Sequence, residues 1–153
     1  MTLDRIDKAI LAALQGNARM SLGEIGTLVG LTGSPCWTRI KRLEDCGVIE
    51  GYSARINATA VGLADTVIVQ VTLDNHSDDA LAAFGRALED IPEVIEVFLM
   101  SGEYDYCLRV VASDTRDYER VLRERVHKIP GIRHSKSTLV LRQLKRSLLP
   151  IGR

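Results

Sequence analysis

The sequence lacks long apolar runs and has few cysteines. No hydrophobic stretch is long enough to cross a bilayer, and no signal-peptide pattern opens the 153 residues. We therefore expect a cytoplasmic protein without a membrane partner. The three cysteines, Cys36, Cys46 and Cys107, are an odd number without metal-ligand spacing. A disulfide framework is not expected in a reducing compartment.

Histidines are equally sparse, and the net charge is zero. His76, His127 and His134 have no regular spacing, so no metal, haem or other cofactor is expected. The zero net charge conceals an uneven distribution. Residues 1–62 carry 7 Lys and Arg against 6 Asp and Glu, residues 63–135 carry 8 against 14, and residues 136–153 carry 5 against 0. An acidic middle repels phosphate, so only the ends of the chain suit a polyanionic partner.

Residues 32–44 combine a helix start, an apolar stripe and a basic outer face. Thr32 or Ser34 can cap a helix, and Pro35 is tolerated in its first turn. At 100° per residue, one side collects Cys36, Ile40 and Leu43, and the other collects Ser34, Thr38, Lys41 and Arg42. Arg39 flanks the basic side, where it can bind phosphate or pair with Glu44. A face of hydroxyls and cations is what a helix that reads DNA needs.

The neighbouring segments supply partners for this helix. Ser21 and Glu24 have capping-box spacing, and Gly30 can end the helix that they begin. Residues 4–15 carry another apolar stripe, so three short helices can share one core. The alternating, glycine-broken run over residues 47–56 is typical of a small β wing. Residues 1–62 are therefore predicted to form a winged helix-turn-helix domain.

Residues 63–153 contain an internal duplication. A strand over residues 67–73, a helix over 78–90 and a strand over 94–100 are followed by a second strand, helix and strand that end near Leu141. Two Ile-Pro pairs, which begin at Ile91 and Ile129, precede the last strand of each unit. The order βαββαβ predicts an α+β, ferredoxin-like domain with both helices on one face of the sheet. The other face carries apolar residues such as Ile68, and a second subunit would cover it.

Between the two repeats lies the turn Ser101-Gly102-Glu103-Tyr104-Asp105. Residue types alone favour a plain β-hairpin turn. Glycine also permits close backbone approach, and free N–H groups together with Asp105 could hold the carboxylate and ammonium of an amino acid. Glu103 and Asp105 lack a nucleophile or base partner, so a catalytic pair is not indicated.

Taken together, the motifs resemble those of the Lrp/AsnC family of feast/famine transcriptional regulators over nearly the whole chain. The matching segments are Leu3-Asp4-x-x-Asp7-x-x-Ile10-Leu11, Leu31-Thr32 through Arg42-Leu43-Glu44, Gly47-Val48-Ile49-x-Gly51-Tyr52 and Gly102-x-Tyr104-Asp105-Tyr106. The resemblance implies dimers through the ferredoxin-like domain, assembly into tetramers or octamers, and an amino-acid effector at the turn. The implied effector residues are Met100, Ser101, Gly102, Glu103, Tyr104 and Asp105, and the implied DNA-binding residues are Ser34, Thr38, Arg39, Lys41 and Arg42.

A narrower resemblance concerns the effector. Residues 34–45 and 100–106 are similar to the subgroup that controls cysteine catabolism and detoxification, which makes L-cysteine one hypothesis beside leucine or another amino acid. Two other classes stay open. Sirohaem decarboxylases resemble the same two-domain architecture, although the intact basic face of residues 34–42 argues against an enzyme. An adaptor that pairs with related chains is the third reading.

Overall fold

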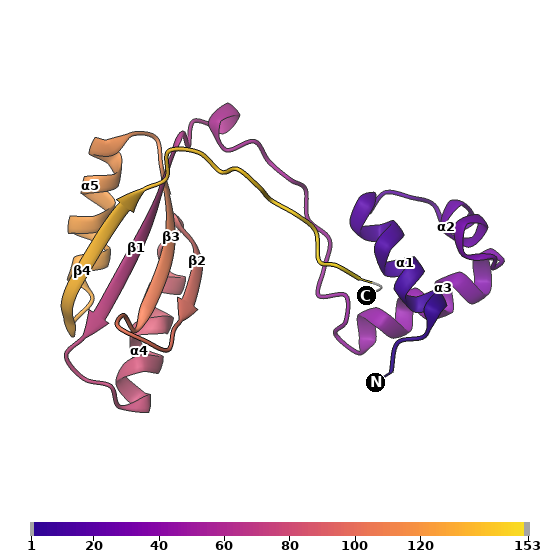
Figure 1. The fold of residues 1–153 in the computed structure, drawn as a ribbon, viewed down its shortest axis with the longest axis horizontal. Coiled ribbons are helices and arrows are strands. Elements are labelled where there is room, and N and C mark those ends of the chain that lie inside the picture. Colours follow the sequence, from indigo (N-terminus) through magenta and orange to yellow (C-terminus); the bar gives the residue numbers. More distant parts are fainter. Residues whose placement is uncertain (1, 152–153) are drawn as a thin grey trace. The chain divides into compact units, whose positions relative to one another are not determined.

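The computed structural model describes residues 2–151, and the chain forms two units (Figure 1). The first unit extends through Arg55 and also includes the C-terminal segment from Lys145; the second runs from Ile56 to Leu144. The chain therefore passes between the units twice. The predicted division at residue 62 had kept the C-terminal segment with the second domain, whereas this segment groups with the first unit.

Three helices build the first unit: α1 (Arg5–Gly16), α2 (Leu22–Val29) and α3 (Gly33–Asp45). The capping box predicted at Ser21 and Glu24 is present, and Gly30 ends α2 in the left-handed conformation with φ of 73°. Helix α1 has a second capping box, formed by Asp4 and Asp7. The shared core contains Ile10, Leu11, Ile25, Cys36, Ile40 and Leu43, with the partly buried Ile151 packed against it. The apolar stripe predicted on residues 36–43 is thereby confirmed.

The segment predicted as a β wing differs from expectation. Over the described residues 47–58, the chain contains no strand. The amides of Val48 and Ile49 instead donate to the carbonyl of Leu43 at 2.9 and 3.0 Å, which folds the chain back over the end of α3. A two-stranded ladder needs a second extended segment beside the first, and no strand among the described residues of this unit supplies one.

The second unit is an antiparallel four-stranded sheet with two helices on one face (Figure 1). The elements are η1 (Thr59–Val61), β1 (Asp65–Leu73), α4 (Asp78–Glu89), β2 (Val94–Leu99), β3 (Tyr106–Ala112), α5 (Thr115–Glu124), η2 (Val126–Lys128) and β4 (Ile132–Leu139). Strand order β2-β3-β1-β4 confirms the ferredoxin-like prediction. The periodicity predicts the second helix of this domain over residues 115–128, but α5 ends at Glu124 and the 3-10 turn η2 follows it.

Alternation along β1 and β3 determines where the core lies. Val67, Val69 and Val71 of β1 and Leu108 and Val110 of β3 are buried against helices α4 and α5. The intervening residues, such as Ile68 and Cys107, are only partly buried and line the face without helices. Phe98 lies on the same open face, paired with Cys107, and its side chain is 53% exposed. This sheet face retains exposed apolar surface in the single chain.

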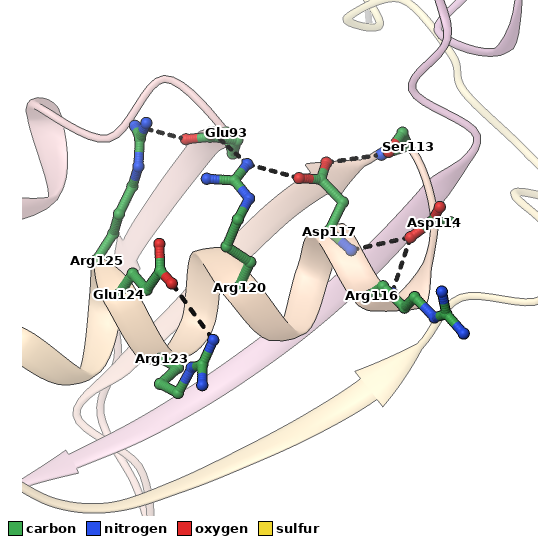
Figure 2. A network of polar contacts seen from close by, with 9 residues as sticks. All are labelled: Glu93, Ser113, Asp114, Arg116, Asp117, Arg120, Arg123, Glu124 and Arg125. Atoms are coloured by element: carbon green, nitrogen blue, oxygen red, sulfur yellow. Dashed lines mark hydrogen bonds and ion pairs between the residues drawn. The ribbon is translucent and has the colours of Figure 1, made fainter.

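Polar contacts begin helix α5 and tie it to neighbouring loops (Figure 2). The Asp114 carboxylate accepts hydrogen bonds from the amides of Arg116 and Asp117 at 2.8 and 2.9 Å. Asp117 in turn accepts from the Ser113 amide at 3.1 Å and lies 2.6 Å from the Arg120 guanidinium. These bonds occupy backbone donors that a helix start leaves without intrahelical partners.

Candidate nucleic-acid interface and effector loop

Helix α3 presents a polar face to solvent. Ser34, Thr38, Lys41 and Arg42 are all exposed, opposite the buried Cys36, Ile40 and Leu43. Thr32 is the N-cap, but its side chain makes no capping hydrogen bond. The Thr38 hydroxyl donates to the Ser34 carbonyl at 3.1 Å, so its oxygen can still accept a hydrogen bond. The predicted separation of the two faces is thus present, with hydroxyls and cations on one surface.

Two arginines of α3 reach a carboxylate on α1. Arg39 Nη1 lies 2.6 Å from Asp4 Oδ2 and 2.8 Å from Asp7 Oδ1. Arg42 Nη2 donates to both carboxylate oxygens of Asp7 at 2.7 Å. The alternative partner considered for Arg39, Glu44, accepts from the Tyr52 hydroxyl at 2.9 Å instead. Both arginines therefore brace helix α3 against α1.

Electrostatics around this cluster follow from the same contacts. The hydrogen bond from the Asp7 amide, followed by the bond to Arg39, lowers the pKa of Asp4. The carboxylates of Asp4 and Asp7 raise the pKa of Arg39. Lys41 makes its own pair with Asp45 at 2.7 Å, one turn along α3, and this bond raises the pKa of Lys41. With raised pKa values, Arg39 and Lys41 stay protonated at neutral pH.

The predicted effector residues form the loop between β2 and β3. The Met100 amide donates to the Asp105 carbonyl at 2.8 Å, which closes the loop across its base. Gly102 has φ of 141°, a region that favours glycine, and a Cβ there would meet no neighbouring atom within 4 Å. Ser101, Gly102 and Glu103 are exposed, whereas Tyr104 is half-buried. The loop thus brings the six predicted residues into one hairpin turn, whose tip at Ser101, Gly102 and Glu103 is exposed.

Asp105 anchors this loop to strand β1. Its Oδ2 accepts from the Leu73 amide at 2.8 Å and lies 3.0 Å from His76 Nε2. The Asp105 amide donates to the Val71 carbonyl at 2.9 Å. This carboxylate therefore already has partners within the chain, and His76 brings a titratable side chain next to the loop.

Sequence reasoning missed two of these partners. In the sequence, Asp7 stands out only as part of the family motif, although its three-residue spacing from Asp4 is the signal of a capping pair. His76 carried no signal at all, because its contact with Asp105 spans 29 positions of sequence. Only the tertiary fold brings these side chains together.

Within residues 2–151, no three His, Cys, Asp or Glu side chains gather in a way that could hold a metal ion. Nor does any helix in that range have the length and apolar character needed to span a bilayer.

The fold and the exposed face of α3 define a helix-turn-helix regulator with an attached sensor domain, and comparisons with known proteins agree. The sequence model of a winged helix-turn-helix DNA-binding domain matches residues 3–50, and that of the Lrp/AsnC ligand binding domain matches residues 66–150. The chain belongs to the Lrp/AsnC family of DNA-binding transcriptional regulators.

Named relatives cover almost the whole chain. It is 36% identical to the DNA-binding transcriptional activator DecR of Escherichia coli K12 over 143 residues, which is 94% of each chain. It is 35% identical to the leucine-responsive regulatory protein of Salmonella typhimurium, over 95% of this chain and 88% of the relative. These relatives are regulators, so the chain is a regulator and not an enzyme.

Solved structures show the same architecture. A transcriptional regulator of Neisseria meningitidis in complex with L-Met matches with a TM-score of 0.91 and 31% identity, over 99% of this chain and 98% of the other. An AsnC family regulator of Agrobacterium tumefaciens matches with a TM-score of 0.89 and 34% identity, over 95% and 94% of the two chains. The two-domain fold is therefore that of the family.

Proposed function

We propose that the chain is an amino-acid-responsive regulator, with residues 1–62 as its DNA-binding domain and residues 63–153 as its sensing and assembly domain, whose last segment, from Lys145, groups with the first unit. The carrying observation is the two-sided helix α3, whose core side is buried while Ser34, Thr38 and Lys41 remain exposed. In this proposal Lys41 and Arg42 contact phosphate or guanine, Arg39 contacts phosphate, and Ser34 and Thr38 add short-range contacts.

The proposed assembly is a cytoplasmic dimer that combines further into tetramers or octamers. The sheet face opposite α4 and α5 leaves Phe98 and Ile68 incompletely covered, and a second copy would bury them. A dimer presents two recognition helices, which enter successive major grooves about one helical turn apart. The weak net charge of a single DNA-binding domain makes this doubling necessary for useful affinity.

The proposed effector is a small α-amino acid bound at Met100, Ser101, Gly102, Glu103, Tyr104 and Asp105. Exposed backbone in the Ser101-Gly102 turn can receive the carboxylate, and Glu103 can receive the ammonium. Leucine and methionine are the amino acids that the names of similar proteins mention, and L-cysteine remains the hypothesis from the narrower sequence resemblance. An effector changes DNA binding only through its different affinities for two assembly states.

Fluorescence anisotropy with DNA from upstream of the chain's own gene tests the regulator. We expect specific binding that weakens steeply with salt and shifts with one amino acid of a panel containing L-leucine, L-methionine and L-cysteine. Lys41→Gln should weaken binding, whereas Lys128→Gln, the same change of charge on an exposed residue of the other unit, should not. Equal loss in both variants would contradict the placement of the interface on α3.

Calorimetry tests the effector loop separately. Glu103→Ala should abolish the heat of amino-acid binding while leaving DNA affinity without effector unchanged. Glu89→Ala serves as the matched control because Glu89 is also exposed and lies at the end of α4. An unchanged heat in Glu103→Ala would move the effector away from this loop. Binding of leucine or methionine without L-cysteine would remove the cysteine hypothesis.

A further inference from the structure

Asp7 is the only buried charged residue in the described part of the chain, with 1% of its surface exposed. Besides the two arginines of α3, its Oδ2 accepts from the Asp4 amide at 3.1 Å. A carboxylate removed from water is costly unless paired and hydrogen-bonded, and here two guanidinium groups and an amide compensate it. The contacts join residues 32 and 35 positions apart, so they fix α3 against α1.

Both arginines retain donors beyond these contacts. Their hydrogen bonds use only Nη1 of Arg39 and only Nη2 of Arg42 within residues 2–151. A guanidinium group has five N–H donors in a planar fork. The Arg42 side chain is 47% exposed and that of Arg39 is 27% exposed. Each can therefore be held by Asp7 and donate to a second acceptor with the rest of its fork.

Charge in the cluster is balanced, because Asp4 and Asp7 offset Arg39 and Arg42. Non-specific DNA binding depends on the number of phosphates neutralised, so paired arginines contribute less to it than unpaired ones. Specific contacts depend more on orientation, because a bidentate bond requires the donors in fixed directions. The carboxylate of Asp7 therefore weakens the non-specific attraction of the two arginines to phosphates and fixes the directions of their N–H donors.

We propose that Asp7 is a positioning residue for DNA recognition, whose buried carboxylate orients Arg39 and Arg42 on α3 and suppresses their attraction to arbitrary phosphates. This inference rests on the proposed DNA-binding face of α3 and adds a residue that does not itself touch DNA. The Asp7 carboxylate thus both holds α3 against α1 and determines the orientation in which Arg39 and Arg42 approach the duplex.

The test compares Asp7→Asn with the wild type on two duplexes, one selected from a random pool by the wild-type protein and one of random sequence. We expect the ratio of specific to random affinity to fall by about tenfold. On the random duplex, the slope of log affinity against log salt should steepen by about 1 to 2, since each released arginine can neutralise one phosphate. A purely structural role predicts an equal loss on both duplexes with the slope unchanged, and that result would overturn the proposal.

Circular dichroism establishes whether the Asp7→Asn helices are intact before binding is measured. Should this variant not fold, Arg42→Lys tests the same idea because it retains the charge and loses the planar fork. It should lower the specific-to-random ratio while leaving the random-duplex slope within about 0.3 of the wild type. A retained ratio in Arg42→Lys would refute the orienting role.

The variant Lys41→Gln distinguishes failure of the proposed DNA-binding role of α3 from failure of the proposed role of Asp7. If α3 does not contact DNA, Lys41→Gln leaves both affinities unchanged. Lys41 is a probe independent of Asp7, because its ion pair in the described chain is with Asp45. If α3 contacts DNA but Asp7 does not orient its arginines, Lys41→Gln weakens binding whereas Asp7→Asn retains the specific-to-random ratio.

Discussion

The hydroxyl of Tyr106 donates a 2.7 Å hydrogen bond to the carbonyl of Leu81, joining strand β3 to helix α4. The ring also packs against Phe84, with centroids 5.0 Å apart and planes tilted by 50°. Tyr106 follows Asp105 directly in sequence. The residue after the proposed effector loop is therefore a buried core residue held by both contacts. Burial raises the pKa of the Tyr106 hydroxyl, which remains a neutral donor across the physiological range.

Tyr106→Phe should therefore cost about 1 kcal/mol of unfolding free energy, through loss of a largely buried hydrogen bond with little change in packing. Chemical denaturation followed by circular dichroism measures this difference. Tyr104→Phe, at the half-buried neighbouring tyrosine, is the comparison. A larger loss at Tyr104 than at Tyr106 would contradict the importance of the contact with Leu81.

Gly26 should tolerate no side chain. A Cβ at this position would lie 2.5 Å from the carbonyl oxygen of Leu31, which belongs to the turn between α2 and α3. Gly26→Ala must shift this backbone, and we expect a loss of about 1 to 3 kcal/mol and weaker DNA binding. Thermal denaturation and anisotropy measure the two effects.

Gly23 provides a matched control for Gly26 within the same helix. A Cβ at Gly23 would have only the Ser21 hydroxyl nearby, at 4.0 Å. Gly23→Ala should therefore stabilise α2 by about 0.5 to 1 kcal/mol, because alanine loses less backbone entropy in a helix. The idea of a tight turn would be untenable if both alanine variants were equally stable.

Asp117 should make the second unit sensitive to acid. The Ser113 amide, followed by Arg120, lowers its pKa below the ordinary value of 3.8 (Figure 2). A lowered carboxyl pKa stabilises the fold above the unfolded-state value, and this contribution is lost as pH falls through the folded-state value. Asp117→Asn should therefore be less stable than wild type at pH 7, with the difference shrinking below about pH 4.

Urea denaturation at several pH values measures the Asp117 effect. Glu119→Gln is the control, because Glu119 is exposed on the same helix and forms an exposed ion pair with Arg123 at 3.4 Å. A pH-independent difference between Asp117→Asn and wild type would show that the carboxylate charge is unimportant at this helix start.

The cysteines should differ in reactivity. Burial raises the pKa of the Cys36 thiol, which is fully buried in the helix core, whereas Cys46 is exposed. Only the thiolate attacks a disulfide reagent, so Cys46 should react first and Cys36 only after unfolding. Reaction with a chromogenic disulfide measures both, and Cys46→Ser should remove the fast phase. Persistence of that phase in Cys46→Ser would assign it to another thiol.

Local sequence signals predicted the elements well where one short pattern determines the structure. Ser21, Glu24 and Gly30 begin and end α2 as expected, and alternation at Val67, Val69 and Val71 identified the buried face of β1. The duplicated Ile-Pro pairs correctly marked the approach to β2 and β4. These features depend on residues close together in sequence, so periodicity and capping rules suffice.

Contacts between distant residues were beyond such rules. Asp7 and Arg42 are joined by a salt bridge, but nothing in either segment alone indicates the other. Residues 47–56 have the alternation of a strand, but the described residues of their unit contain no strand that could pair with them. Nothing in the local pattern of α2 distinguishes Gly26 from an ordinary helix residue, because the carbonyl of Leu31 lies against it only in the folded chain. In each case, the contact depends on tertiary packing, which the local sequence pattern does not determine.

The first unit is discontinuous in sequence, and this has a consequence for how the protein is made. Ile151 packs against a core whose other members all precede residue 50, so the ribosome must translate the entire second unit before that core receives its last side chain. The three helices can associate early in translation, whereas the pocket that Ile151 lines together with Leu3, Ala9 and Ala12 lacks this wall until Ile151 itself has been translated. The helix-turn-helix unit can thus begin to fold before the second unit is translated, and it gains its last core contact only afterwards.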